Sequence, residues 1–350
     1  MKPDFKLITL LFTTLLVNAA SAQKRVDEFI YDEAPFPQCH ASTLVEIPGG
    51  LAAAWFGGTA EGKRDVEIWF STHQEGQWAA PRSVADGVQA SGERFPCWNP
   101  VLFREGDDLR LYYKVGPSPR EWWGMLITSS NNGQDWSEPQ RLPDGILGPI
   151  KNKPVLLGGK RLVAGSSTEH DGWRVHMEWT DDAGKTWEKS SPLNLKGGLE
   201  SIQPTILQLS DGRLQILCRS KNARQVTTAF SKDQGATWSD ISATTLPNNN
   251  SGLDAVTLKD GRHVLVYNHL TRGRHQLHVA MSKDGENWEA VMILENEPGQ
   301  EFSYPAVVQT SDGLVHITYT WKRRRVKHVA FDPAKVESTP IVEGVWPSTK

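Results

Sequence analysis

An eight-residue turn motif that ends in tryptophan recurs along the chain and constrains its fold more than any other feature. The clean copies run from Thr180 to Trp187 and from Ser231 to Trp238, with Asp third, Gly fifth and Thr seventh. The Asp can accept backbone N–H bonds inside the turn, and the Gly can adopt a positive φ. A bulky Trp repeated at this place predicts packing between repeated units. Weaker copies end 50 to 58 residues from their neighbours, at Trp78, Trp136 and Trp288.

A second turn signal repeats with nearly the same period. Residues 200–219 alternate apolar and polar side chains on both sides of Asp211-Gly212, which is typical of a β-hairpin. Six such signals predict six sheets of about four strands each. They are Gly49-Gly50, Asp107-Asp108, Gly158-Gly159, Asp211-Gly212, Asp260-Gly261 and Asp312-Gly313.

Repeated four-stranded units without helical periodicity indicate an all-β chain, and we predict a six-bladed β-propeller. No Pro- or Gly-rich linker divides the sequence, so residues 23–350 are expected to form one domain. The strand that follows residue 22 is expected to complete the last blade. The 38% hydrophobic and 23% charged composition is that of an ordinary globular protein, and a net charge of −3 argues against nucleic acid as a partner.

The first 22 residues have the pattern of a secretory signal peptide. Lys2 and Lys6 precede an apolar run, and Ala20-Ser21-Ala22 provides a small-residue cleavage site. The run is too short for a membrane span, and no other apolar segment approaches its length. We therefore expect an exported protein, periplasmic or secreted, with no membrane span after cleavage.

The three cysteines, Cys39, Cys97 and Cys218, are an odd number for an exported protein. A chain of this length does not need disulfides to build a core, and buried free thiols are the favoured interpretation. A Cys39–Cys97 bridge is the alternative. Because no ligands are spaced as in a zinc site, neither a metal nor another cofactor is expected.

Polar residues open each inner strand, where a propeller binds its ligands. Counting back from the six turn signals gives His40, Asn99, Lys153, Gln203, Asp254 and Tyr304. The second strands return to the same face and add further acids and bases. These include Glu61, Asp65, Glu169, Arg219 and His269. Such a ring of donors, acids and aromatics is typical of a sugar site.

The octads resemble the Asp-boxes, or BNR repeats, of the sialidase superfamily, and the resemblance covers nearly all of residues 23–350. Sialidases bind the substrate carboxylate with three Arg and use a Tyr nucleophile assisted by a Glu, with an Asp as general acid. Arg219 is similar to the second Arg. Arg274 is similar to the third, with Arg272 as a close competitor. Tyr304 resembles the nucleophile.

Three positions depart from that pattern. His40 replaces the first Arg, Gln203 replaces the Glu that assists the Tyr, and the loop of the general acid offers Glu61 and Asp65. Since an amide cannot take a proton, Asp254 or Glu169 would have to serve as the base. Two Arg remain able to hold one carboxylate, so an acidic ligand is still expected.

Three functions are consistent with these residues. The first is an exo-acting glycoside hydrolase that acts on an acidic sugar other than ordinary sialic acid in oligo- or polysaccharides. The second is a lyase or dehydratase on uronate-containing oligosaccharides, in which His40, Tyr304 and Lys153 would move protons. The third is a propeller that binds acidic glycans without catalysis. The basic run 322–325 is interpreted as a solvated strand end that adds positive potential near the mouth, and the oligomeric state is not predicted.

Overall fold

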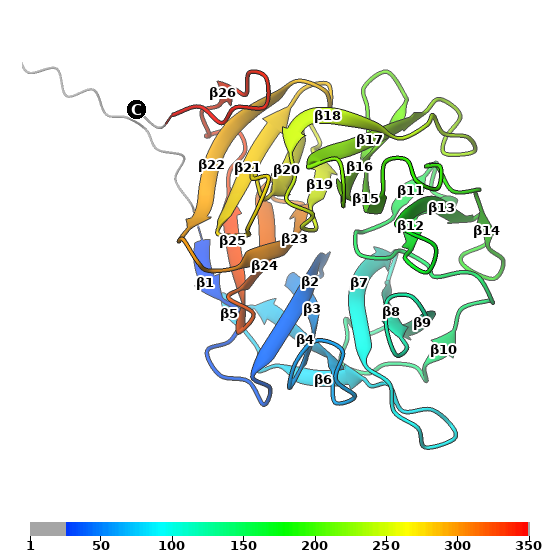
Figure 1. Ribbon diagram of the computed structural model, residues 1–350. Coiled ribbons are helices and arrows are strands. Elements are labelled where there is room, and N and C mark those ends of the chain that lie inside the picture. The colour runs from blue at the N-terminus through cyan, green and yellow to red at the C-terminus, as the bar shows by residue number, and fades with distance from the viewer. Residues whose placement is uncertain (1–25, 349–350) are drawn as a thin grey trace, which may run out of the picture.

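Six antiparallel sheets surround a central axis in the computed structural model, which describes residues 26–348 (Figure 1). Blade 1 contains β2 (Gln38–Ile47), β3 (Gly50–Gly58), β4 (Glu67–Gln74), β5 (Gln77–Trp78) and β6 (Arg82–Ala85). Blade 2 contains β7 (Cys97–Glu105), β8 (Asp108–Val115), β9 (Trp123–Ser129) and β10 (Gln140–Arg141). Blade 3 contains β11 (Val155–Leu157), β12 (Arg161–Thr168), β13 (Arg174–Thr180) and β14 (Glu188–Lys189).

The other three blades follow the same order from the axis outward. Blade 4 contains β15 (Ser201–Gln208), β16 (Leu214–Ser220), β17 (Gln225–Ser231) and β18 (Ser242–Pro247). Blade 5 contains β19 (Asp254–Thr257), β20 (His263–Tyr267), β21 (Gln276–Ser282), β22 (Trp288–Asn296) and β26 (Thr339–Pro340). Blade 6 contains β23 (Phe302–Gln309), β24 (Val315–Trp321), β25 (Arg325–Phe331) and β1 (Val26–Phe29). The predicted six-bladed propeller is confirmed, and each of the six turn signals joins the first two strands of a blade.

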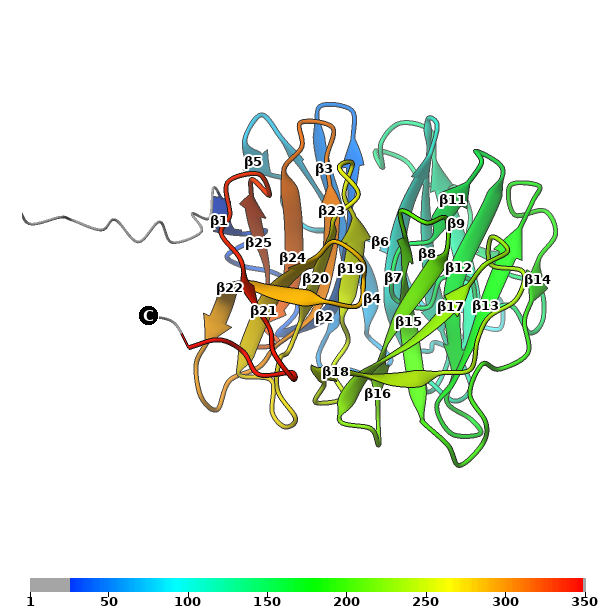
Figure 2. The same cartoon turned by 90° about the horizontal axis from the view of Figure 1, so that it is seen from above.

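The strand nearest the N-terminus closes the ring. β1 pairs antiparallel with β25, with Val26 opposite Ala330 and Phe29 opposite Lys327, and Figure 2 shows the two strands side by side. The strand that follows residue 22 thus completes the last blade, as predicted. This pairing covers an edge of β25 that would otherwise expose unpaired backbone groups.

The octads are structural turns. In the copy from Thr180, Asp182 accepts hydrogen bonds from the Thr186 backbone N–H (2.9 Å) and hydroxyl (2.7 Å). These bonds lower the pKa of Asp182 to about 2. Trp187 donates through Nε1 to the Gly184 carbonyl at 3.2 Å and packs edge-on against Tyr112 of the preceding blade. The motif therefore fixes the turn and supplies an aromatic contact between blades.

All three cysteines are free and buried, so the alternative Cys39–Cys97 bridge is not formed. Burial raises the pKa of the Cys39 thiol to about 12, which leaves it protonated and unreactive at neutral pH. The proposed signal peptide, residues 1–22, lies outside the described residues. Nothing in residues 26–348 forms a helix of the length and apolarity that a membrane span requires.

A buried histidine pair anchors the segment after β26. His269 Nε2 donates to the Gly344 carbonyl at 2.9 Å, and its Nδ1 is bonded to the Tyr267 hydroxyl. His278 accepts the backbone N–H of His269 at 3.2 Å, and the Trp346 ring lies 4.4 Å from the His278 ring. His269 was predicted to bind substrate, but both of its ring nitrogens are used in this packing. We therefore assign it a structural role.

This pair makes stability sensitive to acid. Burial lowers the pKa of His278 from 6.5 to about 3, so the unfolded chain binds a proton on this side chain that the folded chain does not. Its contribution is complete above pH 6.5 and decreases as pH falls toward 3. We expect this site alone to cost on the order of 3 kcal/mol between pH 7 and pH 4.

Urea unfolding of His278→Asn measures this contribution, because Asn keeps an acceptor for the His269 N–H but does not titrate. The loss of unfolding free energy between pH 7 and pH 4 should be smaller in the variant than in the wild type. His170→Asn, which changes an exposed histidine, is the control. Equal losses in the wild type and His278→Asn would contradict the assignment.

Candidate active site

Backbone strain marks one end of the inner strands. Ala41 in β2, Gln203 in β15 and Tyr304 in β23 have φ values of 55°, 56° and 53°, and each lies in an irregularity of strand pairing. Left-handed non-glycine residues cost free energy and concentrate at functional sites. A bulge also redirects side chains that would otherwise alternate across the sheet. The three bulges therefore turn the starts of three blades toward one shared space.

The Tyr304 phenol lies at the middle of this space. Arg219 donates from Nη1 to the phenol oxygen and also to Gln203 Oε1 at 3.3 Å. Gln203 Nε2 lies 3.5 Å from the same phenol oxygen. A Cβ on Gly252 would come within 3.3 Å of the Tyr304 ring, so a glycine at the start of blade 5 allows close packing against it. The structure thus brings together the predicted Tyr304, Gln203 and Arg219.

Positive charge surrounds the tyrosine. The Arg274 guanidinium and the Lys151 ammonium each lie 5.9 Å from the Tyr304 ring centroid. The Arg219 guanidinium lies 5.4 Å from that centroid and stacks on Trp173 at 4.7 Å. Arg219 is 5% exposed, and its Nε has no hydrogen-bond partner among residues 26–348. A buried guanidinium N–H without a partner is suited to an incoming anionic group.

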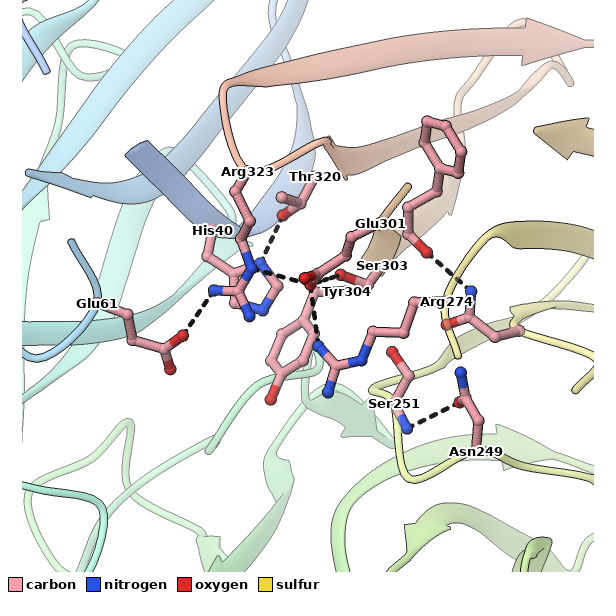
Figure 3. A network of polar contacts seen from close by, with 12 residues as sticks. His40, Glu61, Asn249, Ser251, Arg274, Glu301, Ser303, Tyr304, Thr320 and Arg323 are labelled. Carbon is pink, nitrogen blue, oxygen red and sulfur yellow. Dashed lines mark hydrogen bonds and ion pairs between the residues drawn. The ribbon is translucent and has the colours of Figure 1, made fainter. Parts of the chain in front are cut away.

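His40 packs directly on the tyrosine, with the two ring centroids 4.0 Å apart (Figure 3). Its Nδ1 lies 2.9 Å from the Thr320 hydroxyl. Burial and the nearby charges of Arg323 and Arg274 lower the pKa of His40 well below its usual range. The side chain is therefore neutral at physiological pH. It cannot supply the positive charge expected of a cationic carboxylate ligand.

A second layer of charge lies beside His40. Glu301 Oε1 accepts hydrogen bonds from Arg274 Nη1 (3.0 Å), Arg323 Nε (2.9 Å) and the Ser303 hydroxyl (2.7 Å) (Figure 3). Arg323 also contacts Glu61, which lies on the loop between β3 and β4, with Nη1 2.6 Å from Oε2. The run 322–325 was interpreted as a solvated strand end. For Arg323 this was wrong, since the turn after β24 directs its guanidinium into the site.

The predicted acids differ in their surroundings. Glu169 is half-buried, and burial raises its pKa against the opposing charge of Arg219. Asp65 is exposed and accepts the Thr59 backbone N–H at 2.8 Å; hydrogen bonds from Thr59 lower its pKa. Glu61 is the ion-pair partner of Arg323. The raised pKa of Glu169 makes it the predicted acid best suited to donate a proton.

Asp254 and Lys153 are placed in the scaffold. The Asp254 carboxylate accepts bonds from Lys153 Nζ (3.0 and 3.1 Å), the Thr205 hydroxyl (2.8 Å) and the Val307 backbone N–H (2.9 Å). It is 2% exposed and has no hydrogen bond to Tyr304 in the part of the chain that the structure describes. We therefore withdraw the base role of Asp254 and the proton-transfer role of Lys153, since both groups are fully used in joining blades.

Comparison with known proteins identifies the family of the chain. Residues 49–317 match the model of the BNR repeat-like domain family. The chain belongs to this family. Two curated sialidases are similar to it: that of Paraclostridium sordellii is 26% identical over 48% of this chain and 50% of its own length, and that of Clostridium perfringens is 24% identical over 48% and 49%. The chain spans about half the length of these relatives.

Solved structures share the fold of this BNR repeat-like protein. A Dyadobacter fermentans protein of unknown function has a TM-score of 0.72 at 15% identity, covering 89% of this chain and 98% of that one. NanB sialidase of Streptococcus pneumoniae has a TM-score of 0.69 at 12% identity, covering 89% and 71%. A leech intramolecular trans-sialidase has a TM-score of 0.70 at 13% identity, covering 91% and 71%.

The sequence analysis missed three residues of this site. Lys151 donates to Asn152 Oδ1 (2.9 Å), the Leu253 carbonyl (3.1 Å) and the Pro305 carbonyl, and burial lowers its pKa to about 7. Glu301 and Trp173 were not considered either. Lys151 was missed because β11 has only three residues, so that counting back from the turn selected Lys153.

Two further predicted residues, Asn99 and Arg272, have no hydrogen bond to Tyr304 in the described part of the chain. Asn99 donates to the Ile150 carbonyl at 3.3 Å and is 5% exposed, so it links blades 2 and 3. The exposed Arg272 lies two residues before Arg274, and Arg274 is the one that lies over Tyr304. Within residues 26–348, no three His, Cys, Asp or Glu side chains are grouped to hold a metal ion.

Proposed function

We propose that the protein is an exo-acting glycoside hydrolase that releases a carboxylate-bearing sugar from oligo- or polysaccharides. The observation that carries this proposal is the hydrogen bond from buried Arg219 to the Tyr304 phenol inside a ring of cations. Tyr304 and Arg219 are 9% and 5% exposed, which favours a chain end over the middle of a polymer as the group that reaches them.

Tyr304 is the proposed nucleophile. A phenol approaches an anomeric centre next to a carboxylate with less charge repulsion than a carboxylate nucleophile would. The hydrogen bond from Arg219 becomes stronger as the phenol oxygen gains negative charge, and the Arg274 charge acts in the same direction. Gln203 cannot accept the phenol proton, so its role is to position the ring and Arg219.

Glu169 is the proposed general acid. As Tyr304 bonds to the anomeric carbon and gives its phenol proton to solvent water, the Glu169 proton would pass to the glycosidic oxygen and the glycosidic bond would break. Water would then give a proton to the Glu169 carboxylate and attack the same carbon, which releases the Tyr304 phenolate to regain its proton from solvent. A carboxyl with a raised pKa suits both steps.

An uncharged imidazole at position 40 changes the hydrogen bonds that the site can offer a carboxylate, and this favours an acidic sugar other than ordinary sialic acid. Resemblance to the sialidases places a cationic Arg where this chain has an imidazole without charge. Arg219, with its unpartnered Nε, and Arg274 remain to hold the carboxylate. Because a Tyr304 nucleophile is favoured where the anomeric carbon carries a carboxylate, a 2-ulosonic acid other than ordinary sialic acid is the substrate class that we favour.

A screen of acidic oligosaccharides, sialosides and uronate glycans together, tests the proposal. We expect mass spectrometry to detect a released acidic monosaccharide that has gained one water. Incubation in H₂¹⁸O should label the new reducing end. Binding of an acidic glycan with no bond cleavage after long incubation would instead identify a glycan-binding propeller.

A lyase or dehydratase acting on uronate-containing oligosaccharides is the second candidate. The contact of neutral His40 with Tyr304 favours it, because an imidazole of lowered pKa can accept a proton next to a carboxylate. Arg219 would stabilise the enolate that develops. The product decides between the two, since an unsaturated uronate absorbs in the ultraviolet and gains no water.

A further inference from the structure

We infer that Arg323 is a third cation of the carboxylate site, and that Glu61 is an exchangeable counter-ion whose place on Arg323 is taken by the ligand's carboxylate. This inference rests on the proposed function for one point only, the acidic sugar as ligand. It assigns Glu61 a role in setting affinity, in place of the general-acid role that the sequence suggested.

The backbone holds Arg323 beside His40. The Cys39 N–H donates to the Arg323 carbonyl at 2.8 Å, and the Lys322 N–H donates to the Glu301 carbonyl at 2.7 Å. Lys322 and Arg323 have φ values of 53° and 60°, so two successive non-glycine residues are left-handed. Two successive positive φ values are usual in a tight hairpin turn, and the two backbone hydrogen bonds hold this turn in place. The turn between β24 and β25 is therefore built to direct this guanidinium toward the axis.

The charges near Glu301 do not balance without Glu61. One Glu301 oxygen accepts from both Arg274 and Arg323, so a single negative charge serves two guanidinium groups. Glu61 supplies the second negative charge at 2.6 Å. An anion that replaced Glu61 would meet a cation already oriented by Glu301. The charge of Arg323 is also among the causes that lower the pKa of His40, so Arg323 lies near the position that lacks a cationic side chain.

Glu61 is the replaceable member of this group. Its side chain is 41% exposed, against 29% for Glu301, and it lies on the loop between β3 and β4. That loop contains Gly62 with a φ of 81°. Its contact with Arg323 is an exposed ion pair, which is weak because water competes for both charges. A sugar carboxylate bound at the same time by Arg219 and Arg274 can therefore displace it.

Titration calorimetry of the full chain with D-glucuronate and N-acetylneuraminate tests this inference, with D-glucose as the neutral control. Glu61→Gln should bind the acidic sugar about fivefold more tightly, because the resident competitor has lost its charge. Arg323→Gln should bind it at least about tenfold more weakly. Lys322→Gln is the matched control, since Lys322 is in the same turn but pairs with Glu297 at 2.6 Å, and should leave affinity unchanged.

Unchanged or weaker binding by Glu61→Gln would overturn the inference, as would wild-type affinity in Arg323→Gln or binding of neither acid by the wild type. Thermal melting of each variant checks that folding is intact. The proposed hydrolase fails separately: if both variants change affinity as expected but no glycan is cleaved, the anion site stands and the catalytic proposal falls. If glycans are cleaved but Arg323→Gln binds the acidic sugar with wild-type affinity, the catalytic proposal stands and the inference about Arg323 falls.

Discussion

Tyr304→Phe is expected to reduce turnover of the acidic substrate by at least about a thousandfold, as removal of a nucleophile does in other enzymes. The substitution removes only the phenol oxygen that receives the Arg219 hydrogen bond. The ring and its contact with His40 remain, so substrate binding should stay within a few-fold of the wild type. Steady-state kinetics on a substrate from the screen, together with calorimetry on the same ligand, measures the two effects separately.

Tyr113→Phe is the matched control for this experiment. Tyr113 is fully buried in β8, and its hydroxyl has no hydrogen-bond partner among residues 26–348. The loss of that hydroxyl should leave turnover unchanged. Glu169→Gln provides a comparison within the site. It should reduce turnover of natural substrates much more than turnover of nitrophenyl glycosides, because their leaving groups need no proton. More than a tenth of wild-type turnover in Tyr304→Phe would remove Tyr304 from the mechanism.

The blade architecture was predictable because its signals are local. The octads and hairpin turns specify the ends of strands, and their spacing specifies the number of blades. The same counting placed Gln203 and Tyr304 at strand starts, and Arg219 at the end of a returning strand. Counting back from the turns succeeded for Gln203 and Tyr304 because β15 and β23 are both eight residues long. Both strands also carry a bulge at the same point, which brings these side chains and Arg219 together.

The partners of each side chain were not predictable, because they lie in other blades. The bond from Lys153 to Asp254 spans 101 residues, and the bond from Arg323 to Glu61 spans 262. Alternation shows that Asp254 and Tyr304 start inner strands, but it does not show which start faces the ligand and which faces the scaffold. For the same reason Arg323 was interpreted as solvated, since its neighbours in sequence are all basic.

Asp254→Asn tests the structural role of Asp254 and is expected to lower the free energy of unfolding by about 3 to 5 kcal/mol. Oδ1 accepts from Lys153, the Thr205 hydroxyl and the Ala255 N–H, and Oδ2 accepts from Lys153 and the Val307 N–H. An amide nitrogen at either position would place N–H groups against N–H donors. It would also leave the Lys153 ammonium without its anion.

Urea unfolding measures this loss, and Lys153→Met in the Asp254→Asn background should recover part of it by removing the unpaired charge. Asp144→Asn, which breaks the exposed pair with Arg141 at 3.6 Å, should cost less than about 1 kcal/mol. If Asp254 were a catalytic base, Asp254→Asn would lose turnover but keep the free energy of unfolding of the wild type. If Asp254→Asn unfolds like the wild type but is inactive, the carboxylate has a catalytic role. A large loss of unfolding free energy shows instead that the carboxylate holds blades 3 to 6 in the register on which Tyr304 and Arg219 depend.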